Sequence, residues 1–256
     1  MSTQVILAGA TGWIGKPLAE AILAADDLEL AAAVSRSSAG QRLGPIAIFG
    51  SVEEALRVPA DVFVDYTSAA AVRGNVLAAI AAGLHVVVGS SGLSDDDYAE
   101  IDTAARGRGV GVIAVGNFAI SAALLQRFAA EAARHMPNWE IIDYAHDSKP
   151  DAPSGTAREV AWRLSQVAPP RTRIPIGETF GHPEARGANI SGSQVHSLRL
   201  PGHTIGVEVI LGREDERLSI RYEGGVGAEP YIAGTLLAIR RAAEARGLVR
   251  GMERLL

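Results

Sequence analysis

A short polar segment near the middle of the chain concentrates side chains that can transfer protons and bind anions. It reads YAHDSKPDAPSGTA, from Tyr144 to Ala157, and is too polar for a core strand and too interrupted for a helix. His146 and Lys149 can each donate a proton or carry a positive charge. The Ser-Gly-Thr run at 154–156 opens a predicted helix, and the first backbone amides of a helix form an anion site. The segment is therefore either a polar surface loop or part of an active site.

A second chemical pattern is the glycine-rich turn VILAGATGWIGKPLAEAI, in which Gly9, Gly12 and Gly15 lie between an apolar strand and a helix. Glycines there allow a tight turn, a close backbone approach to a pyrophosphate and a helix seated against the strand. The context predicts a dinucleotide site, and the alternative is a bare structural turn. The residues of the predicted loop are Gly9, Ala10, Thr11, Gly12, Trp13, Ile14 and Gly15.

The end of the second predicted strand bears on the choice between NAD and NADP. NAD sites usually carry an acidic residue there, which binds the ribose hydroxyls. This chain instead has Ser35, Arg36, Ser37 and Ser38. An arginine flanked by hydroxyls suits a 2′-phosphate, so NADPH is the predicted cofactor and NADH the alternative. A solvated surface arginine is the simpler interpretation of Arg36.

The elements that must position these residues alternate in type over the first 116 residues. Continuous apolar strands separated by helices predict a parallel sheet covered on both faces, as in a Rossmann-type α/β domain. The predicted strands are 4–8, 28–34, 61–66, 84–89 and 109–115, and the predicted helices are 16–25, 71–83 and one that starts at Ser94.

The pattern changes after Asn117. Helices are predicted over 121–136 and 155–168 and a long loop over 171–193, while the runs at 194–202, 203–212 and 216–224 alternate apolar and polar residues like half-buried antiparallel strands. We therefore expect two domains. A Rossmann domain at 1–117 is followed by an α+β domain at 118–228 with a mixed or antiparallel sheet, and the segment 229–256 returns as a helix to the first domain.

Composition excludes several classes of function. The net charge of −5 argues against nucleic-acid binding, and the absence of cysteine excludes disulfides, thiolate nucleophiles and cysteine zinc sites. The six histidines show no metal-ligand spacing, so no metal is expected. No apolar run is long enough to span a membrane, and no basic leader precedes the first strand. We expect a cytoplasmic protein without membrane or nucleic-acid partners.

Four segments, in order along the chain, resemble the 4-hydroxy-tetrahydrodipicolinate reductase (dihydrodipicolinate reductase) family of bacterial lysine biosynthesis. FVDYTSAAAV resembles its Asp-Phe-Thr segment, VVVGSSGL its Gly-Thr-Thr-Gly segment and VGNFAIS its Asn-Phe-Ser segment. KPDAPSGTA matches its Lys-x-Asp-Ala-Pro-Ser-Gly-Thr-Ala motif, the longest and most specific of the four. The similarity runs from residue 5 to about residue 160 and continues more loosely to about residue 222.

The resemblance implies an NAD(P)H-dependent reductase of a cyclic imine dicarboxylate, assembled as a tetramer, with a dimer as the alternative. Lys149 and His146 would be catalytic, and both would also bind substrate together with Ser154, Gly155 and Thr156. Arg36 would meet the adenosine ribose or its phosphate. The segments on the nicotinamide side would be Gly89, Ser90 and Ser91, followed by Val115, Gly116, Asn117 and Phe118.

The chain departs from the family pattern at three places. The family usually has two adjacent histidines before the lysine, whereas this chain has Ala145 and His146. Lys149 alone could donate the proton, another histidine could enter from elsewhere, or the substrate could differ. Trp13 stands where the family often has arginine, and the last strand leads into RYEGGVGAEPYIAG instead of the family's His- and Arg-containing segment.

Three functions therefore remain open at this stage. The first is the dipicolinate-type reductase itself, which converts 4-hydroxy-tetrahydrodipicolinate to tetrahydrodipicolinate. The second is a relative that reduces a different imine or enamine, which the substitution at Ala145 favours. The third is a non-catalytic NADPH-binding sensor, although such a protein would not need the polar cluster from Lys149 to Thr156.

Overall fold

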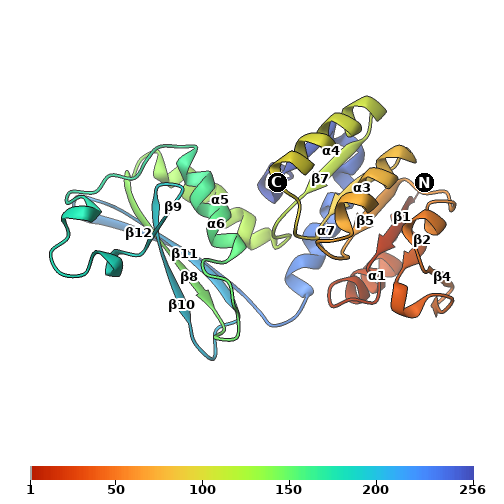
Figure 1. The fold of residues 1–256 in the computed structure, drawn as a ribbon, viewed down its shortest axis with the longest axis horizontal. Coiled ribbons are helices and arrows are strands. Elements are labelled where there is room, and N and C mark those ends of the chain that lie inside the picture. The colour runs from red at the N-terminus through yellow and green to blue at the C-terminus, as the bar shows by residue number, and fades with distance from the viewer. Residues whose placement is uncertain (1) are drawn as a thin grey trace. The chain divides into compact units, whose positions relative to one another are not determined.

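A computed structural model describes residues 2–256 of the chain. The chain divides into two compact units, the first formed by the residues up to 120 together with 228–256 and the second by 121–227. Each unit has its own sheet, and the two are described separately (Figure 1).

The first unit is built on an eight-stranded sheet with the order β13-β7-β6-β5-β1-β2-β4-β3. Every neighbouring pair is parallel except β3 and β4, which are antiparallel. The Rossmann-type parallel sheet expected from the sequence is confirmed. Its strands are β1 (Thr3–Ala8), β2 (Leu28–Val34), β3 (Arg42–Leu43), β4 (Ile46–Phe49), β5 (Val62–Asp65), β6 (His85–Val88), β7 (Gly111–Ala114) and β13 (Gly247–Arg250).

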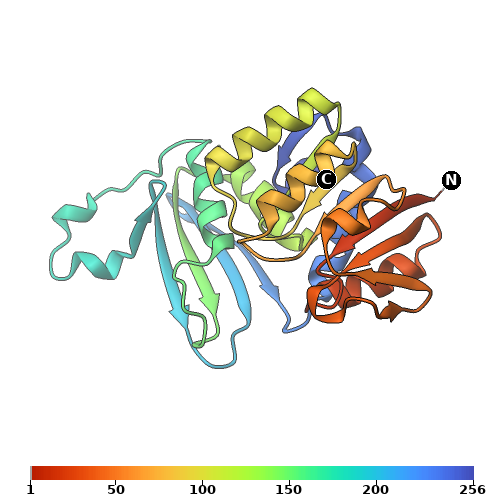
Figure 2. The same ribbon diagram turned by 45° about the vertical axis from the view of Figure 1, so that its right-hand side comes forward.

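Helices lie on both faces of this sheet, as Figure 2 shows. The central strands are fully buried because apolar side chains on both of their faces meet helices, which explains their continuous Val, Ile and Ala runs. Helix α4 begins with a capping box between Ser94 and Asp97 and ends at Gly109 in a left-handed conformation. The helices are α1 (Gly15–Ala24), α2 (Val52–Ala55), α3 (Val72–Ala81), α4 (Asp95–Arg108) and α7 (Glu229–Arg241).

Two parts of this unit differ from the sequence-based expectation. The segment 42–55 contains β3, β4 and α2, which were not predicted, because none exceeds four residues. The C-terminal segment does not end as a helix. After α7 and a short 3-10 turn at Ala242–Glu244, strand β13 pairs in parallel with β7 at the sheet edge.

The second unit is a five-stranded sheet with the order β12-β11-β8-β10-β9, which carries helices α5 (Ile120–Ala133) and α6 (Gly155–Ser165). Strand β8 lies between β10 and β11; it runs parallel to β10 and antiparallel to β11, so the mixed sheet expected for this domain is confirmed. The sheet is mixed because only the β8–β10 pair is parallel. Its strands are β8 (Asn138–Ala145), β9 (Ala188–Ile190), β10 (Ser193–Arg199), β11 (Ile205–Arg213) and β12 (Glu216–Gly224).

Two further properties concern the described residues as a whole. Over residues 2–256, no helix combines the length and the apolar character that crossing a membrane requires. The same residues contain no cluster of three His, Cys, Asp or Glu side chains that could hold a metal ion.

Candidate functional site

The glycine loop has the close-packed geometry that a pyrophosphate site requires. Gly9 has a φ of +82°, and a Cβ atom there would lie 2.1 Å from the carbonyl oxygen of Tyr66. A Cβ at Gly15, the first residue of α1, would lie 1.9 Å from the oxygen of Gly9. The amide of Gly12 donates to that same oxygen over 2.9 Å. Larger residues would therefore force the turn open, and the bare backbone at the start of α1 fits a dinucleotide.

Hydroxyl groups connect this loop to the end of β2. The Thr11 and Ser35 Oγ atoms lie 2.6 Å apart, and the Ser35 and Ser37 Oγ atoms lie 3.3 Å apart. Arg36, between the two serines, is exposed, and its guanidinium has no hydrogen-bond or ion-pair partner among residues 2–256. A cation beside three hydroxyls is suited to bind a phosphate.

A buried carboxylate organises the same edge of the sheet at the end of β5. Asp65 has no exposed surface. Its Oδ1 accepts hydrogen bonds from the Ser90 hydroxyl (2.6 Å) and from the hydroxyl and amide of Thr67 (2.8 and 3.0 Å). Its Oδ2 accepts from the Asn75 side chain over 2.8 Å. Sequence reasoning did not identify this role, although an acid that ends the buried run VFVD was the available signal.

The two segments expected on the nicotinamide side follow β6 and β7. Gly89 is required because a Cβ there would lie 2.2 Å from the ring of Tyr66. The Ser90 hydroxyl is engaged by Asp65, whereas Ser91 is exposed. After β7, Gly116 is exposed, and its neighbours Val115, Asn117 and Phe118 are buried. All predicted cofactor residues thus follow the carboxyl ends of β1, β2, β6 and β7, the edge where open α/β sheets bind ligands.

In the second unit, the predicted anion site is the N-terminus of α6. Ser154 is the N-cap, and its Oγ accepts the amide of Ala157 over 3.2 Å. Gly155 and Thr156 form the first turn, with Gly155 exposed and Thr156 buried. The side chain of Ser154 is therefore used as the cap, and the positive end of the dipole of an eleven-residue helix lies at this turn, which suits an anion.

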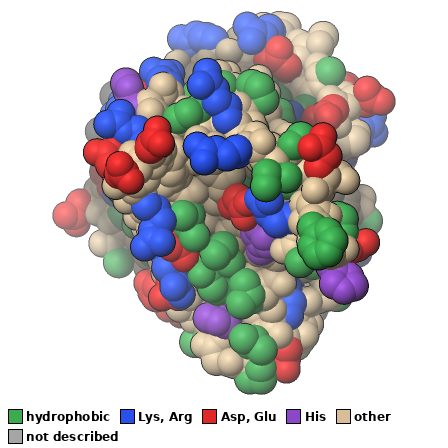
Figure 3. All heavy atoms as spheres, turned by 90° about the vertical axis from the view of Figure 1, so that its left-hand side faces the viewer, with side chains coloured by type: hydrophobic (Ala, Val, Ile, Leu, Met, Phe, Trp, Pro, Cys, Tyr) green, Lys and Arg blue, Asp and Glu red, His purple; other side chains and the backbone are tan. Residues whose placement is uncertain are grey.

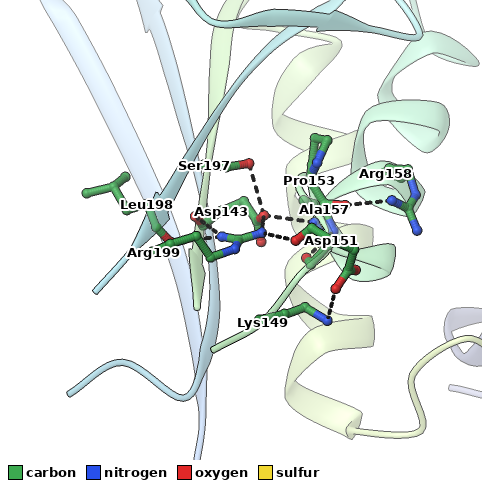
Figure 4. A network of polar contacts seen from close by, with 10 residues as sticks. Asp143, Lys149, Asp151, Pro153, Ala157, Arg158, Ser197, Leu198 and Arg199 are labelled. Carbon is green, nitrogen blue, oxygen red and sulfur yellow. Dashed lines mark hydrogen bonds and ion pairs between the residues drawn. The ribbon is translucent and has the colours of Figure 1, made fainter. Parts of the chain in front are cut away.

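A buried ion pair holds the loop that leads into α6 (Figure 4). Asp143 on β8 is fully buried, and its Oδ2 accepts from Arg199 (2.7 Å), Ser197 (3.2 Å) and the amide of Ser154 (2.8 Å). Arg199 also donates to the carbonyl of Asp151 over 2.8 Å. Two strands and the loop are thereby joined through one carboxylate. Sequence reasoning did not find Asp143 or Arg199, although an acid at a core position of an alternating strand was a signal.

Lys149 and His146 lie in the more exposed half of the loop. The Lys149 ammonium binds Asp151 Oδ1 at 2.7 Å, and its hydrogen bond is the main cause that lowers the pKa of that carboxyl. The Nδ1 atom of His146 lies 2.8 Å from the Ser148 hydroxyl and 2.9 Å from Asp147 Oδ1. The His146 amide carbonyl accepts the Lys149 amide, so a tight turn brings the two predicted catalytic residues together.

The positions of Ala145 and of the other histidines in this sheet bear on which side chain can donate the proton. Ala145 ends β8 and is fully buried, on the strand face that also carries Asp143. His196 is bonded to Glu140 at 2.7 Å, and the His203 ring packs against Tyr144 at 5.2 Å. Glu140 and Tyr144 alternate with Asp143 and Ala145 along β8, so both histidines are engaged on the other face of the sheet.

Breaking the Asp143–Arg199 pair tests how strongly the loop depends on it. Arg199→Ala leaves the Asp143 carboxylate buried without its cation, so we expect a loss of about 3–5 kcal/mol in the free energy of unfolding. Arg213→Ala, which removes an exposed ion pair with Glu216 in the same sheet, should cost less than about 1 kcal/mol. Urea unfolding measures both values, and equal losses would contradict a special role for Arg199.

Comparison with known proteins covers the whole chain. The family model for the N-terminus of dihydrodipicolinate reductase matches residues 3–118, and the model for its C-terminus matches residues 121–256. A 4-hydroxy-tetrahydrodipicolinate reductase of Desulfitobacterium hafniense (strain DSM 10664 / DCB-2) is 36% identical over 263 residues, covering 99% of this chain and 98% of that protein. One of Streptococcus suis (strain 05ZYH33) is 36% identical over 256 residues and covers both chains completely.

Solved structures show the same relationship. Dipicolinate-bound dihydrodipicolinate reductase from Paenisporosarcina sp. TG-14 superposes with a TM-score of 0.89 at 28% identity over all of both chains. An amine dehydrogenase from Mycobacterium smegmatis has a TM-score of 0.68 at 15% identity, over 99% of this chain and 96% of that chain, which shows a shared fold alone. With both family models matched and more than a third of the residues identical to those relatives, the chain belongs to the dihydrodipicolinate reductase family.

Proposed function

We propose that this protein is the NAD(P)H-dependent reductase that converts 4-hydroxy-tetrahydrodipicolinate to tetrahydrodipicolinate in the route to diaminopimelate and lysine. The observation that carries the proposal is the KPDAPSGTA loop, whose Lys149 ammonium precedes an N-terminal helix turn held by buried Asp143. A rigid anion site next to a cationic proton donor suits a substrate with two carboxylates. Full-length identity of 36% to reductases of that name supports the same conclusion.

Cofactor binding is assigned to the first unit. The backbone of Gly9 to Gly15 holds the pyrophosphate, while Gly89–Ser91 and Val115–Phe118 approach the nicotinamide. When bound, the nicotinamide supplies the hydride. NADPH is the proposed cofactor because Arg36 and the hydroxyls of Thr11, Ser35 and Ser37 are suited to a 2′-phosphate, and no acid stands there to bind the ribose of NADH.

Substrate binding and proton transfer are assigned to the second unit. The amides of Gly155 and Thr156 hold one carboxylate, and the Lys149 ammonium holds the other. The ring loses its hydroxyl as water, and reduction then adds one hydride and one proton to the ring. Lys149 donates that proton, and His146 binds the substrate. Ala145 cannot supply the imidazole that the family usually has there.

A second candidate function follows from the same alanine. Ala145 is fully buried, and His196 and His203 lie against Glu140 and Tyr144 on the other face of β8. A related imine or enamine whose reduction does not need a histidine at this position is therefore the alternative substrate. A non-catalytic NADPH sensor is the third candidate, and it would bind the cofactor without turnover.

The direct test incubates the protein with NADPH and the freshly formed condensation product of pyruvate and aspartate semialdehyde, and follows the nicotinamide absorbance. We expect steady oxidation of NADPH. Lys149→Ala should lower kcat about 100- to 10,000-fold with cofactor affinity unchanged, because it removes the proton donor. Lys149→Arg keeps the charge but cannot give up its proton, so it should restore KM and not kcat.

Each opposing result has a distinct meaning. Full activity of Lys149→Ala would show that another group donates the proton. Oxidation of NADPH with a different cyclic imine, but not with this product, would support the second candidate. Tight NADPH binding without any turnover would support the sensor.

The choice of cofactor can be tested at Arg36. Replacing Arg36 by Ala removes the charge that binds the 2′-phosphate, so KM for NADPH should rise at least about tenfold while KM for NADH stays the same. Arg42→Ala is the matched control, because Arg42 is a nearby exposed arginine that bonds only to the Pro45 carbonyl. If the two variants behave alike in steady-state kinetics with both cofactors, Arg36 does not select NADPH.

We also propose that the protein is a homo-oligomer, a tetramer as the family resemblance implies, joined through the face of the second sheet that α5 and α6 leave open. This face carries Ile142, Leu198 and Ile210 among charged residues. Figure 3, which looks onto this side, shows hydrophobic side chains in a band bordered by charged ones. A half-apolar sheet face of this kind is suited to association with a second copy.

Leu198→Asp should dissociate the assembly, because a buried carboxylate without a partner is unfavourable in an interface. Leu218→Asp is the control, since Leu218 is similarly exposed but pairs with Leu211, which is buried on the other face of the sheet. Sedimentation equilibrium measures the mass of each variant. A wild-type monomer, or a Leu198→Asp variant of unchanged mass, would contradict the proposal.

A further inference from the structure

Aromatic side chains and one threonine form a row along the cofactor edge of the first unit. The rings of Trp13 and Tyr231 meet edge to face with centroids 5.8 Å apart. The Tyr231 carbonyl accepts a hydrogen bond from Thr235 (2.8 Å), whose hydroxyl is also 2.7 Å from the Tyr66 hydroxyl. The Tyr66 ring in turn lies 6.0 Å from that of Phe118. We call these five residues the aromatic row.

The row joins segments that are distant in the sequence. Trp13 belongs to the glycine loop, Tyr66 follows β5 and Phe118 follows β7, while Tyr231 and Thr235 come from α7 near the end of the chain. The row packs closely against two glycines, Gly89 and Gly234. A Cβ at Gly89 would lie 2.2 Å from the Tyr66 ring, and a Cβ at Gly234 would lie 1.8 Å from the Phe118 oxygen.

The interior of the row is fixed, whereas its outer end is open. Burial raises the pKa of Tyr66, which keeps its phenol neutral and able to share a hydrogen bond with Thr235. Trp13, in contrast, is 61% exposed, although its indole contacts the Tyr231 ring. Much of a large aromatic side chain is therefore exposed to solvent on the loop that binds the pyrophosphate.

The two sides of the glycine loop are chemically different. Thr11 bonds to Ser35 at the end of β2, on the side where Arg36 and the hydroxyls are suited to the adenosine half. Trp13 contacts α7 instead, and Tyr66 and Phe118 follow β5 and β7, which lie on the opposite side of β1 from β2. A dinucleotide whose pyrophosphate sits on the loop and whose adenosine lies over β2 must extend its nicotinamide half along the row.

We propose that Trp13 contacts the nicotinamide half of the bound cofactor with its exposed indole, and that Tyr231 is the positioning residue that holds the indole in place. The proposal rests on the cofactor assignment made above and adds side chains of the glycine loop and α7 to it.

The test separates the two halves of the cofactor by calorimetry with NADPH and with 2′,5′-ADP, which contains only the adenosine half. Trp13→Ala should weaken NADPH binding about tenfold and leave 2′,5′-ADP binding unchanged, because only the nicotinamide half loses a stacking partner. Trp162→Ala is the matched control, since Trp162 is also exposed, at 51%, but belongs to α6 in the second unit. It should alter neither affinity.

Fluorine NMR of protein labelled with 5-fluorotryptophan reports the contact directly. The chain has three tryptophans, so Trp13→Phe and Trp162→Phe assign the resonances. The Trp13 signal should shift with NADPH and stay in place with 2′,5′-ADP. Tyr231→Ala should raise KM for NADPH at unchanged kcat, whereas Tyr231→Phe, which keeps the ring, should behave like the wild type.

Three outcomes overturn the proposal. They are an unshifted Trp13 resonance in saturating NADPH, an equal loss of affinity for both ligands in Trp13→Ala, and a Tyr231→Phe variant as impaired as Tyr231→Ala. Each requires that the wild-type protein binds NADPH. If the wild-type protein binds neither ligand, the cofactor assignment itself has failed, and the proposal fails with it.

Discussion

The carboxylate of Asp143 is the point on which the geometry of the second unit depends. It is fully buried, and one of its oxygens accepts hydrogen bonds from a guanidinium, a hydroxyl and a backbone amide. Removing such a group from water is expensive, and only a nearby cation with several donors offsets the cost. The amide that it binds belongs to Ser154, the N-cap of α6. The same ion pair therefore fixes where the helix starts and in which direction its first turn points.

Asp65 has a comparable role in the first unit. It is the last residue of β5, has no exposed surface, and accepts hydrogen bonds from residues of two loops and a helix. In both units a buried carboxylate ties the loop that follows its own strand to a neighbouring element. Loops carry the functional groups of α/β proteins but have little core of their own, so a buried polar centre gives them rigidity that apolar packing cannot.

The sequence predicted the fold class and the placement of the glycine loop because both follow from local patterns. Continuous apolar runs such as LELAAAV predict buried parallel strands. Gly9, Gly12 and Gly15 mark the turn between the first strand and the first helix. It did not predict β13, because a four-residue strand has no periodicity to recognise and is selected by pairing with β7. Nor did it place β10 beside β8, because the order of strands in a sheet is a long-range property that the alternation of apolar and polar residues does not predict. Arg199 was missed for the same reason: its partner Asp143 is 56 residues away.

The loop before α6 is divided into two parts with different mechanical properties, and this division bears on proton transfer. From Asp151 to Ser154 the backbone is held by Arg199 and Asp143, so the proposed anion site is rigid. From His146 to Lys149 the contacts are local and the side chains are partly exposed, and the Lys149 ammonium pairs with Asp151. A substrate whose carboxylate is bound at the rigid part would therefore present its ring to the Lys149 side chain, which can still change its conformation. A flexible ammonium on a four-carbon chain is better suited to that task than an imidazole fixed on a strand, which offers a physical reason why a chain with Ala145 can retain the reaction.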